Sequence, residues 1–253
     1  MVKGLETFRV WFADFADQYV LIGGTAAGLS MAEAGLDFRL TKDLDIVLHV
    51  EALTPDFGRV FWRFIEAGGY EIRQASGTGR PVFYRFQKPA DDHFPVMIEL
   101  FSRAPDGFQP GEGCRLTPIP LDEAVTSLSA ILLDEVYYNF IMTGRHERNG
   151  LPWVGAERLI PLKAAAWLDL TARKAAGEQV DSRDIHKHLK DVLRLSQLLA
   201  PATRIPLVAK IAEDMAHFLS ALKTEASVDL KSLRLGNATV AELAGRIAQV
   251  YEL

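Results

Sequence analysis

The chain has 253 residues, of which 49% are hydrophobic and 24% are charged, and its formal net charge is −5. These values are typical of a folded globular protein and exclude a disordered, fibrous or collagen-like chain. Cys114 is the single cysteine, which excludes an internal disulfide and a cysteine-ligated zinc site. We therefore expect a reducing, cytoplasmic environment. No uncharged stretch approaches the ~18 apolar residues of a membrane span, so we expect no membrane association.

The first part of the chain alternates predicted strands and helices. Apolar residues recur at helical spacing over 4–17, 26–33 and 57–67, and short apolar runs predict strands over 19–22, 43–50, 82–86 and 96–101. This order predicts an α+β or α/β domain over residues 1–118, with a mixed sheet and flanking helices.

From Pro118 onward the patterns become helical. The predicted helices cover 134–142, 162–176, 185–199 and 205–222, with a last one that Asn237 or Thr239 caps and that ends at Tyr251. We therefore predict a mainly helical second domain over residues 119–253, in which 121–133 fits a strand or a helix. The net charge is −7 over residues 1–150 and +2 over 151–253, which favours metal-binding carboxylates in the first part and groups that face phosphates in the second.

A glycine pair joins the first predicted strand to the next helix. In Gly23-Gly24-Thr25 the strand runs through two glycines into a helix start. Such a turn offers backbone N–H groups and a positive helix terminus to a phosphate. Glycine pairs are also common at tight turns for structural reasons alone, so the turn by itself leaves both interpretations open.

Two carboxylates begin the following strand. Asp43 and Asp45 are two residues apart, so in a strand they point to the same side, about 6.6 Å apart along the chain. That arrangement suits a shared divalent cation, Mg²⁺ or Mn²⁺. The alternative is a strand that starts in a polar loop, where both aspartates face water. Asp45 favours the metal, because it lies inside the apolar pattern, where a carboxylate should not be buried unpaired.

Glu99 is the one polar residue of the predicted strand 96–101. It either pairs with a cation of the core, Arg39 or Arg85, or completes a three-carboxylate magnesium site with Asp43 and Asp45. We favour the metal site.

In combination, the glycine turn, the Asp-x-Asp strand and the later acidic strand resemble the nucleotidyltransferase superfold, which DNA polymerase beta shares with many transferases. The resemblance covers about residues 19–101. The more particular pattern, GGTA at 23–26 followed by FRLTKDLD at 38–45, is similar to the AbiEii/AbiGii-type nucleotidyltransferases. Many members of that family are toxins of toxin–antitoxin or phage-defence systems.

The resemblance implies metal-dependent transfer of a nucleoside monophosphate from an NTP to an acceptor hydroxyl, with Asp43 and Asp45 as catalytic metal ligands. It implies an RNA acceptor such as tRNA and, for a toxin, a cognate antitoxin protein as partner. The residues expected to hold the triphosphate are Gly23, Gly24, Thr25 and Thr41. The alternative is a nucleotide- or partner-binding module that has this fold and degenerate or no catalysis.

In that family a lysine in an alanine-rich helix and a later aspartate complete the active site. Lys163, in LIPLKAAA at 159–166, matches the lysine, and Asp184, in DSRDIHKH at 181–188, matches the aspartate. The resemblance implies that Lys163 neutralises the triphosphate across a cleft between the domains, with little role in folding, and that Asp184 is a base or positioning group. From the residues alone, without the family resemblance, Lys163 is interpreted as an ordinary surface lysine. Asp184 is then a carboxylate that gains from the helix dipole.

Overall fold

The computed structural model describes residues 2–72, 84–101, 134–225 and 228–253. Its contacts divide the chain into two compact units, Met1–Glu33 with Asp37–Gly155, and Ala34–Leu36 with Ala156–Leu253. Cys114, the segment 121–133 and the predicted boundary at residue 118 lie outside the described residues.

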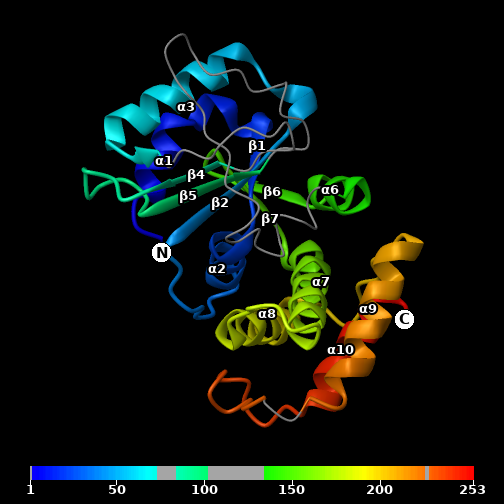
Figure 1. Cartoon of the computed structure of the whole chain (residues 1–253). Coiled ribbons are helices and arrows are strands. Elements are labelled where there is room, and N and C mark those ends of the chain that lie inside the picture. The colour runs from blue at the N-terminus through cyan, green and yellow to red at the C-terminus, as the bar shows by residue number, and fades with distance from the viewer. Residues whose placement is uncertain (1, 73–83, 102–133, 226–227) are drawn as a thin grey trace. The chain divides into compact units, whose positions relative to one another are not determined.

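A mixed sheet forms the centre of the first unit (Figure 1). Its seven described strands have the order β3-β4-β5-β2-β1-β7-β6. The strands are β1 (Tyr19–Leu21), β2 (Asp43–Leu48), β3 (Glu71–Ile72), β4 (Tyr84–Gln87), β5 (Met97–Phe101), β6 (Arg145–Arg148) and β7 (Leu151–Val154). β2 runs parallel to β5, and β1 runs parallel to β7, whereas the other neighbouring strands are antiparallel. The predicted fold class, a mixed sheet with flanking helices, is confirmed.

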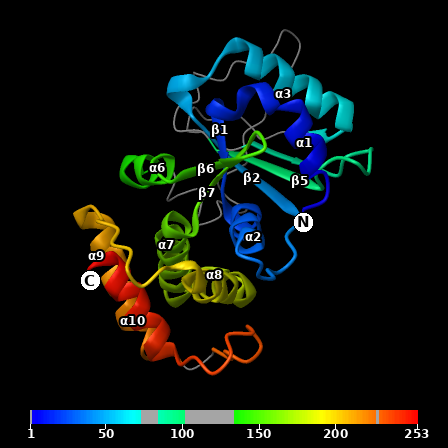
Figure 2. The same ribbon diagram turned by 180° about the vertical axis from the view of Figure 1, so that it is seen from behind.

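Helices cover both faces of this sheet (Figures 1 and 2). The helices of the unit are α1 (Leu5–Trp11), α2 (Gly23–Glu33), α3 (Pro55–Gly68) and α6 (Glu135–Met142), with short 3-10 helices η1 (Ala13–Gln18) and η2 (Val50–Ala52). α1 and α3 pack on one face through aromatic rings, among them Phe8, whose ring centroid lies 5.6 Å from that of Phe64 and 5.4 Å from that of Tyr19. α2 lies on the other face, which carries the two aspartates of β2.

One hairpin of this sheet is absent from the sequence prediction. Asn149 and Gly150 join β6 to β7 with φ angles of 55° and 72°, and this two-residue turn matches the twist of the strands. β7 then pairs in parallel with β1, where Trp153 stands opposite Leu21. Residues 145–154 therefore belong to the first unit, and the described division between the units falls at Gly155.

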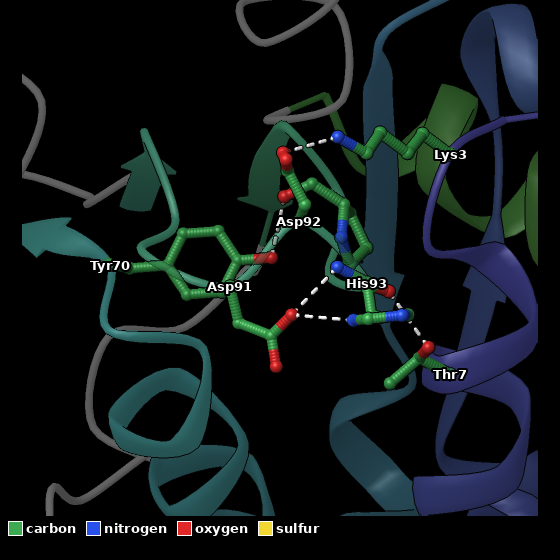
Figure 3. Close-up of polar contacts among 7 residues, drawn as sticks. Lys3, Thr7, Tyr70, Asp91, Asp92 and His93 are labelled. Atoms are coloured by element: carbon green, nitrogen blue, oxygen red, sulfur yellow. Dashed lines mark hydrogen bonds and ion pairs between the residues drawn. The ribbon is translucent and has the colours of Figure 1, made fainter.

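The loop between β4 and β5 is tied to the N-terminal helix (Figure 3). The Thr7 hydroxyl donates to the carbonyl of His93 at 2.8 Å. Lys3 Nζ lies 2.5 Å from Oδ1 of Asp92, and this contact holds the pKa of the Asp92 carboxyl below its usual value. Both contacts anchor the approach to β5, the strand that carries Glu99.

The second unit is helical over its described residues. Its elements are α7 (Ala156–Ala175), α8 (Ser182–Leu195), η4 (Ser196–Leu198), α9 (Ala209–Leu222) and α10 (Val240–Tyr251). Thr239 caps α10, as predicted, in a reciprocal pair of hydrogen bonds with Glu242. None of the helices in the described ranges is both long enough and apolar enough to cross a membrane.

A proline inside α7 is compensated from α10. α7 begins at Ala156, ahead of the predicted start at residue 162, and contains Pro161. Pro161 has no N–H to donate to the carbonyl of Glu157, four residues earlier. The Tyr251 hydroxyl donates to that carbonyl instead, at 2.7 Å, and so links the last helix to the first helix of the unit.

Candidate functional site

The glycine turn packs directly against the strand that carries the two aspartates. The Ile22 N–H donates to the carbonyl of Asp45 at 3.0 Å, and the Thr25 hydroxyl donates to the carbonyl of Asp43 at 2.9 Å. Gly23 has a φ of +64°, and a Cβ at this residue would lie 2.7 Å from Cγ of Asp45. The close approach of the Asp45 carboxylate thus requires glycine at this position, independently of the backbone angle.

The same turn is the first turn of α2, which begins at Gly23 and not at the predicted residue 26. The first hydrogen bond of the helix runs from the Ala26 N–H to the Ile22 carbonyl, at 3.1 Å. The backbone N–H groups before Ala26 therefore have no acceptor within the helix. They are the groups that a phosphate would use.

A polar side chain and a cation also approach this turn. A Cβ at Gly24 would lie 2.7 Å from Oγ1 of Thr41 and 3.4 Å from Nη2 of Arg39. The Arg39 guanidinium carbon lies 5.3 Å from the centre of the Phe38 ring, within the range of a cation–π contact. In the sequence, Arg39 is one of two candidate partners for Glu99. The structure instead places Arg39 beside the glycine turn.

Three carboxylates lie on the α2 face of the sheet. Asp43 stands opposite Met97, and Asp45 stands opposite Glu99, in the parallel pairing of β2 with β5. Paired residues of neighbouring strands point to the same face, so Glu99 lies beside Asp45. Asp45 and Glu99 are 7% and 6% exposed, and Asp43 is half-buried.

Glu99 forms an ion pair with Arg85, which stands opposite it on β4. Glu99 Oε1 accepts a hydrogen bond from Nε of Arg85 at 2.7 Å and lies 2.5 Å from Nη2. Across the described ranges, no three His, Cys, Asp or Glu side chains are grouped so that they could hold a metal ion. The structure thus gives Glu99 the ion pair with Arg85, one of the two alternatives, and does not assemble the predicted three-carboxylate site.

The residues at the glycine turn still fit a magnesium or manganese ion. Mg²⁺ commonly binds one or two carboxylates and completes its octahedral shell with water and substrate phosphates. Asp43 and Asp45 supply two such carboxylates on one strand, and Asp45 lies against the backbone of Gly23. Carboxylates of the kind that bind Mg²⁺ and backbone N–H groups of the kind that bind phosphate are therefore adjacent.

Lys163 is buried within the second unit. It is 1% exposed, and its Nζ donates to Oδ2 of Asp191 on α8 at 2.9 Å. Asp191 is fully buried. The interpretation of Lys163 as an ordinary surface lysine is therefore wrong. Burial also changes the expected effect of replacing Lys163, since the lysine compensates a buried carboxylate and so contributes to folding.

Asp184 is exposed in the first turn of α8. Asp181 caps this helix, because its Oδ1 accepts from the Arg183 N–H at 2.8 Å. A carboxylate at the position of Asp184 gains from the helix dipole. The partner of Lys163 in the structure is Asp191, which is absent from the sequence prediction, although a charged residue next to the apolar stripe of a helix is a signal for a buried partner.

No protein-family model matches the sequence, and no curated protein matches it either. The assignment to the AbiEii/AbiGii-type nucleotidyltransferases therefore stays a prediction. It depends on the residues of 23–26 and 38–45 and on the contacts among them.

Proposed function

We propose that this protein is a metal-dependent nucleotidyltransferase that moves a nucleoside monophosphate from an NTP to an acceptor hydroxyl. The contact between Gly23 and the carboxylate of Asp45 carries the proposal. A nucleotide with its metal needs N–H donors for phosphate and carboxylates for the ion, next to each other. A glycine turn that only reverses the chain has no need of a carboxylate packed against it.

The triphosphate would bind at the first turn of α2. The backbone N–H groups of Gly23, Gly24 and Thr25 would donate to phosphate oxygens, with Thr41 beside them. Arg39 supplies a positive charge next to Gly24. The Thr25 hydroxyl already donates to the Asp43 carbonyl, so it contributes by fixing the turn to the strand.

Asp43 and Asp45 would hold the Mg²⁺ or Mn²⁺ ion, which when bound would polarise the α-phosphate and activate the acceptor hydroxyl. In the transfer, the acceptor oxygen forms a bond to the α-phosphorus while the bond to pyrophosphate breaks. The residues of the chain orient these groups. The hydrogen bonds from Ile22 and Thr25 to β2 keep the phosphate-binding turn in register with both carboxylates.

Further parts of the proposal rest on the resemblance alone. They are an RNA acceptor such as tRNA, a cognate antitoxin as partner, and a role for Asp184 in the transfer. A cytoplasmic location is proposed from the single cysteine, Cys114. The resemblance gives Lys163 as a cation for the triphosphate, but its burial and its pair with Asp191 within the second unit do not support that role. Asp184 would act as a base or a positioning group.

A labelling experiment tests the transfer. The full chain is incubated with total cellular RNA, Mg²⁺ and each of the four NTPs labelled at the α-phosphate. We expect label in RNA with at least one NTP and none with Asp45→Asn, while Asp56→Asn, an exposed aspartate of α3, keeps wild-type transfer. Binding of an NTP without transfer to RNA, protein or small hydroxyl compounds would instead favour a binding module.

A further inference from the structure

We propose that Arg85, held in place by Glu99, is a nucleotide-binding residue whose outer guanidinium edge binds the phosphates of the substrate. The inference rests on the proposed function and deepens it. It makes Glu99 a positioning residue for Arg85 and leaves the metal to Asp43 and Asp45.

Arg85, Glu99 and Asp45 form a row across three neighbouring strands. Arg85 stands opposite Glu99 in the β4–β5 pairing, and Glu99 stands opposite Asp45 in the β5–β2 pairing. All three side chains therefore belong to the α2 face. With neighbouring strands about 4.8 Å apart, the Cα atoms of Arg85 and Asp45 lie about 10 Å apart. A triphosphate that is bound at Asp45 and the start of α2 shares its face of the sheet with Arg85.

The contact with Glu99 leaves part of the guanidinium available. Glu99 contacts Nε and Nη2 through one oxygen, Oε1, so the contact occupies one edge of the group. A guanidinium carries five N–H donors, and Arg85 has no other polar partner in the part of the chain that the structure describes. The Glu99 side chain is 8% exposed and that of Arg85 is 27% exposed. The carboxylate is thus enclosed, whereas part of the Arg85 side chain is accessible.

The ion pair suits Arg85 as a phosphate-binding residue better than it suits Glu99 as a metal ligand. A guanidinium binds phosphate oxygens in a two-pronged geometry, and a guanidinium that is already held in position loses little conformational freedom on binding. Glu99 is engaged by a cation within its own sheet, whereas a metal ligand must direct a carboxylate oxygen at the ion. Because no three carboxylates in the described ranges are grouped to hold a metal, we assign to Glu99 the role of orienting Arg85 through Oε1.

Binding of inorganic tripolyphosphate with Mg²⁺ to the full chain, measured by calorimetry, tests the role of Arg85. We expect Arg85→Gln to weaken binding about 10- to 100-fold, the effect of losing a hydrogen bond to a charged group. Arg85→Lys should recover only part of this loss, because it keeps the charge without the two-pronged geometry. The matched control is Lys88→Gln, which replaces an exposed cation that follows β4 and pairs with Glu71, and it should bind as the wild type does.

Binding of Mn²⁺ alone tests the role of Glu99. The double variant Arg85→Gln/Glu99→Gln removes one charge of each sign, so the net charge stays constant. We expect its Mn²⁺ affinity to stay within about threefold of wild type, whereas loss of a metal ligand would lower it at least about tenfold. A tenfold loss would therefore overturn the assignment of Glu99.

The outcomes separate this inference from the proposed function. Unchanged tripolyphosphate binding in folded Arg85→Gln and Arg85→Lys, together with loss of binding in Asp45→Asn, would overturn the inference and leave the proposed function intact. Absence of tripolyphosphate or Mn²⁺ binding by the wild type would contradict both. A circular-dichroism melt of each variant identifies any that does not fold, and Arg85→Lys then decides the result for Arg85.

Discussion

The two units bury charged groups in different ways. On the α2 face of the first unit, three carboxylates lie with Arg85, which pairs with Glu99, and Arg39 lies beside the glycine turn. In the second unit, Lys163 and Asp191 form one pair of opposite charges. Buried charge is costly unless it is compensated. On the carboxylate-rich face we propose that a bound metal ion adds to this compensation, whereas the pair in the second unit suits a scaffold contact. The ratio of carboxylates to cations, more than the degree of burial, distinguishes the α2 face from the pair in the second unit.

The largest expected effect comes from breaking the pair in the second unit. Lys163→Met should lower the free energy of unfolding by about 3–5 kcal/mol, because it removes the cation that compensates a fully buried carboxylate. Urea unfolding followed by circular dichroism measures the change. A loss below about 1 kcal/mol would show that the pair does not act as a scaffold.

The double variant Lys163→Met/Asp191→Leu sharpens this result. It replaces both charges by apolar groups of similar size, and such replacements of buried pairs are often neutral or stabilising. We therefore expect it to unfold at a higher urea concentration than Lys163→Met. Equal stability of the single and double variants would instead mean that the loss comes from packing around Lys163.

A medium effect is expected at the glycine turn. Gly23→Ala should cost about 1–3 kcal/mol, because the residue has a positive φ and its new Cβ would collide with Asp45. Gly35→Ala is the matched control, since Gly35 has a φ of +71° and no described atom lies within 4 Å of the position that its Cβ would occupy. Both variants share the backbone strain, so the difference between their unfolding free energies reports the contact with Asp45. Equal costs would contradict that contact.

The smallest effect concerns the hydrogen bond that compensates Pro161. Tyr251→Phe should cost about 1 kcal/mol at pH 7, because the Glu157 carbonyl loses the donor that Tyr251 provides. Urea midpoints of both proteins at pH 7 measure this difference. A midpoint equal to that of the wild type would show that the bond contributes nothing.

The same variant carries a pH prediction. Burial raises the pKa of Tyr251 well above its usual value of about 10. A raised pKa in the folded state gives stability that is complete below about pH 10 and is lost as the pH rises toward the folded value. The wild type should therefore lose more stability than Tyr251→Phe between pH 7 and pH 11. Parallel losses would contradict the burial of this hydroxyl.

Local patterns in the sequence predict much of the fold, and long-range pairings account for what they miss. The predicted strand 43–50 and helix 57–67 correspond to β2 and α3, because apolar periodicity reflects burial. The hairpin of β6 and β7 is missed although Asn149-Gly150 is a strong turn signal, since no element is predicted between the helices 134–142 and 162–176. Its parallel pairing with β1 joins residues far apart in the sequence, which no local pattern reveals.

In the candidate site, too, local patterns predict some features, whereas others depend on long-range pairing. The closeness of the glycine turn to Asp43 and Asp45 follows from a strand–turn–helix pattern beside a second strand, so motif order predicts it. The choice between Arg39 and Arg85 as the partner of Glu99 depends on the order of strands in the sheet, which the sequence leaves open. Asp191 is missed because its pairing with Lys163 links two helices across 28 residues.

The central claim is that the face with excess carboxylates binds a metal together with a nucleotide, and calorimetry tests it most directly. The full chain is titrated with each of four non-hydrolysable NTP analogues, with and without Mg²⁺, and so is Asp43→Asn/Asp45→Asn. We expect the wild type to bind at least one analogue only when Mg²⁺ is present, and the double variant to lose this dependence. Equal binding by the two proteins, or wild-type binding that is independent of Mg²⁺, would contradict the claim.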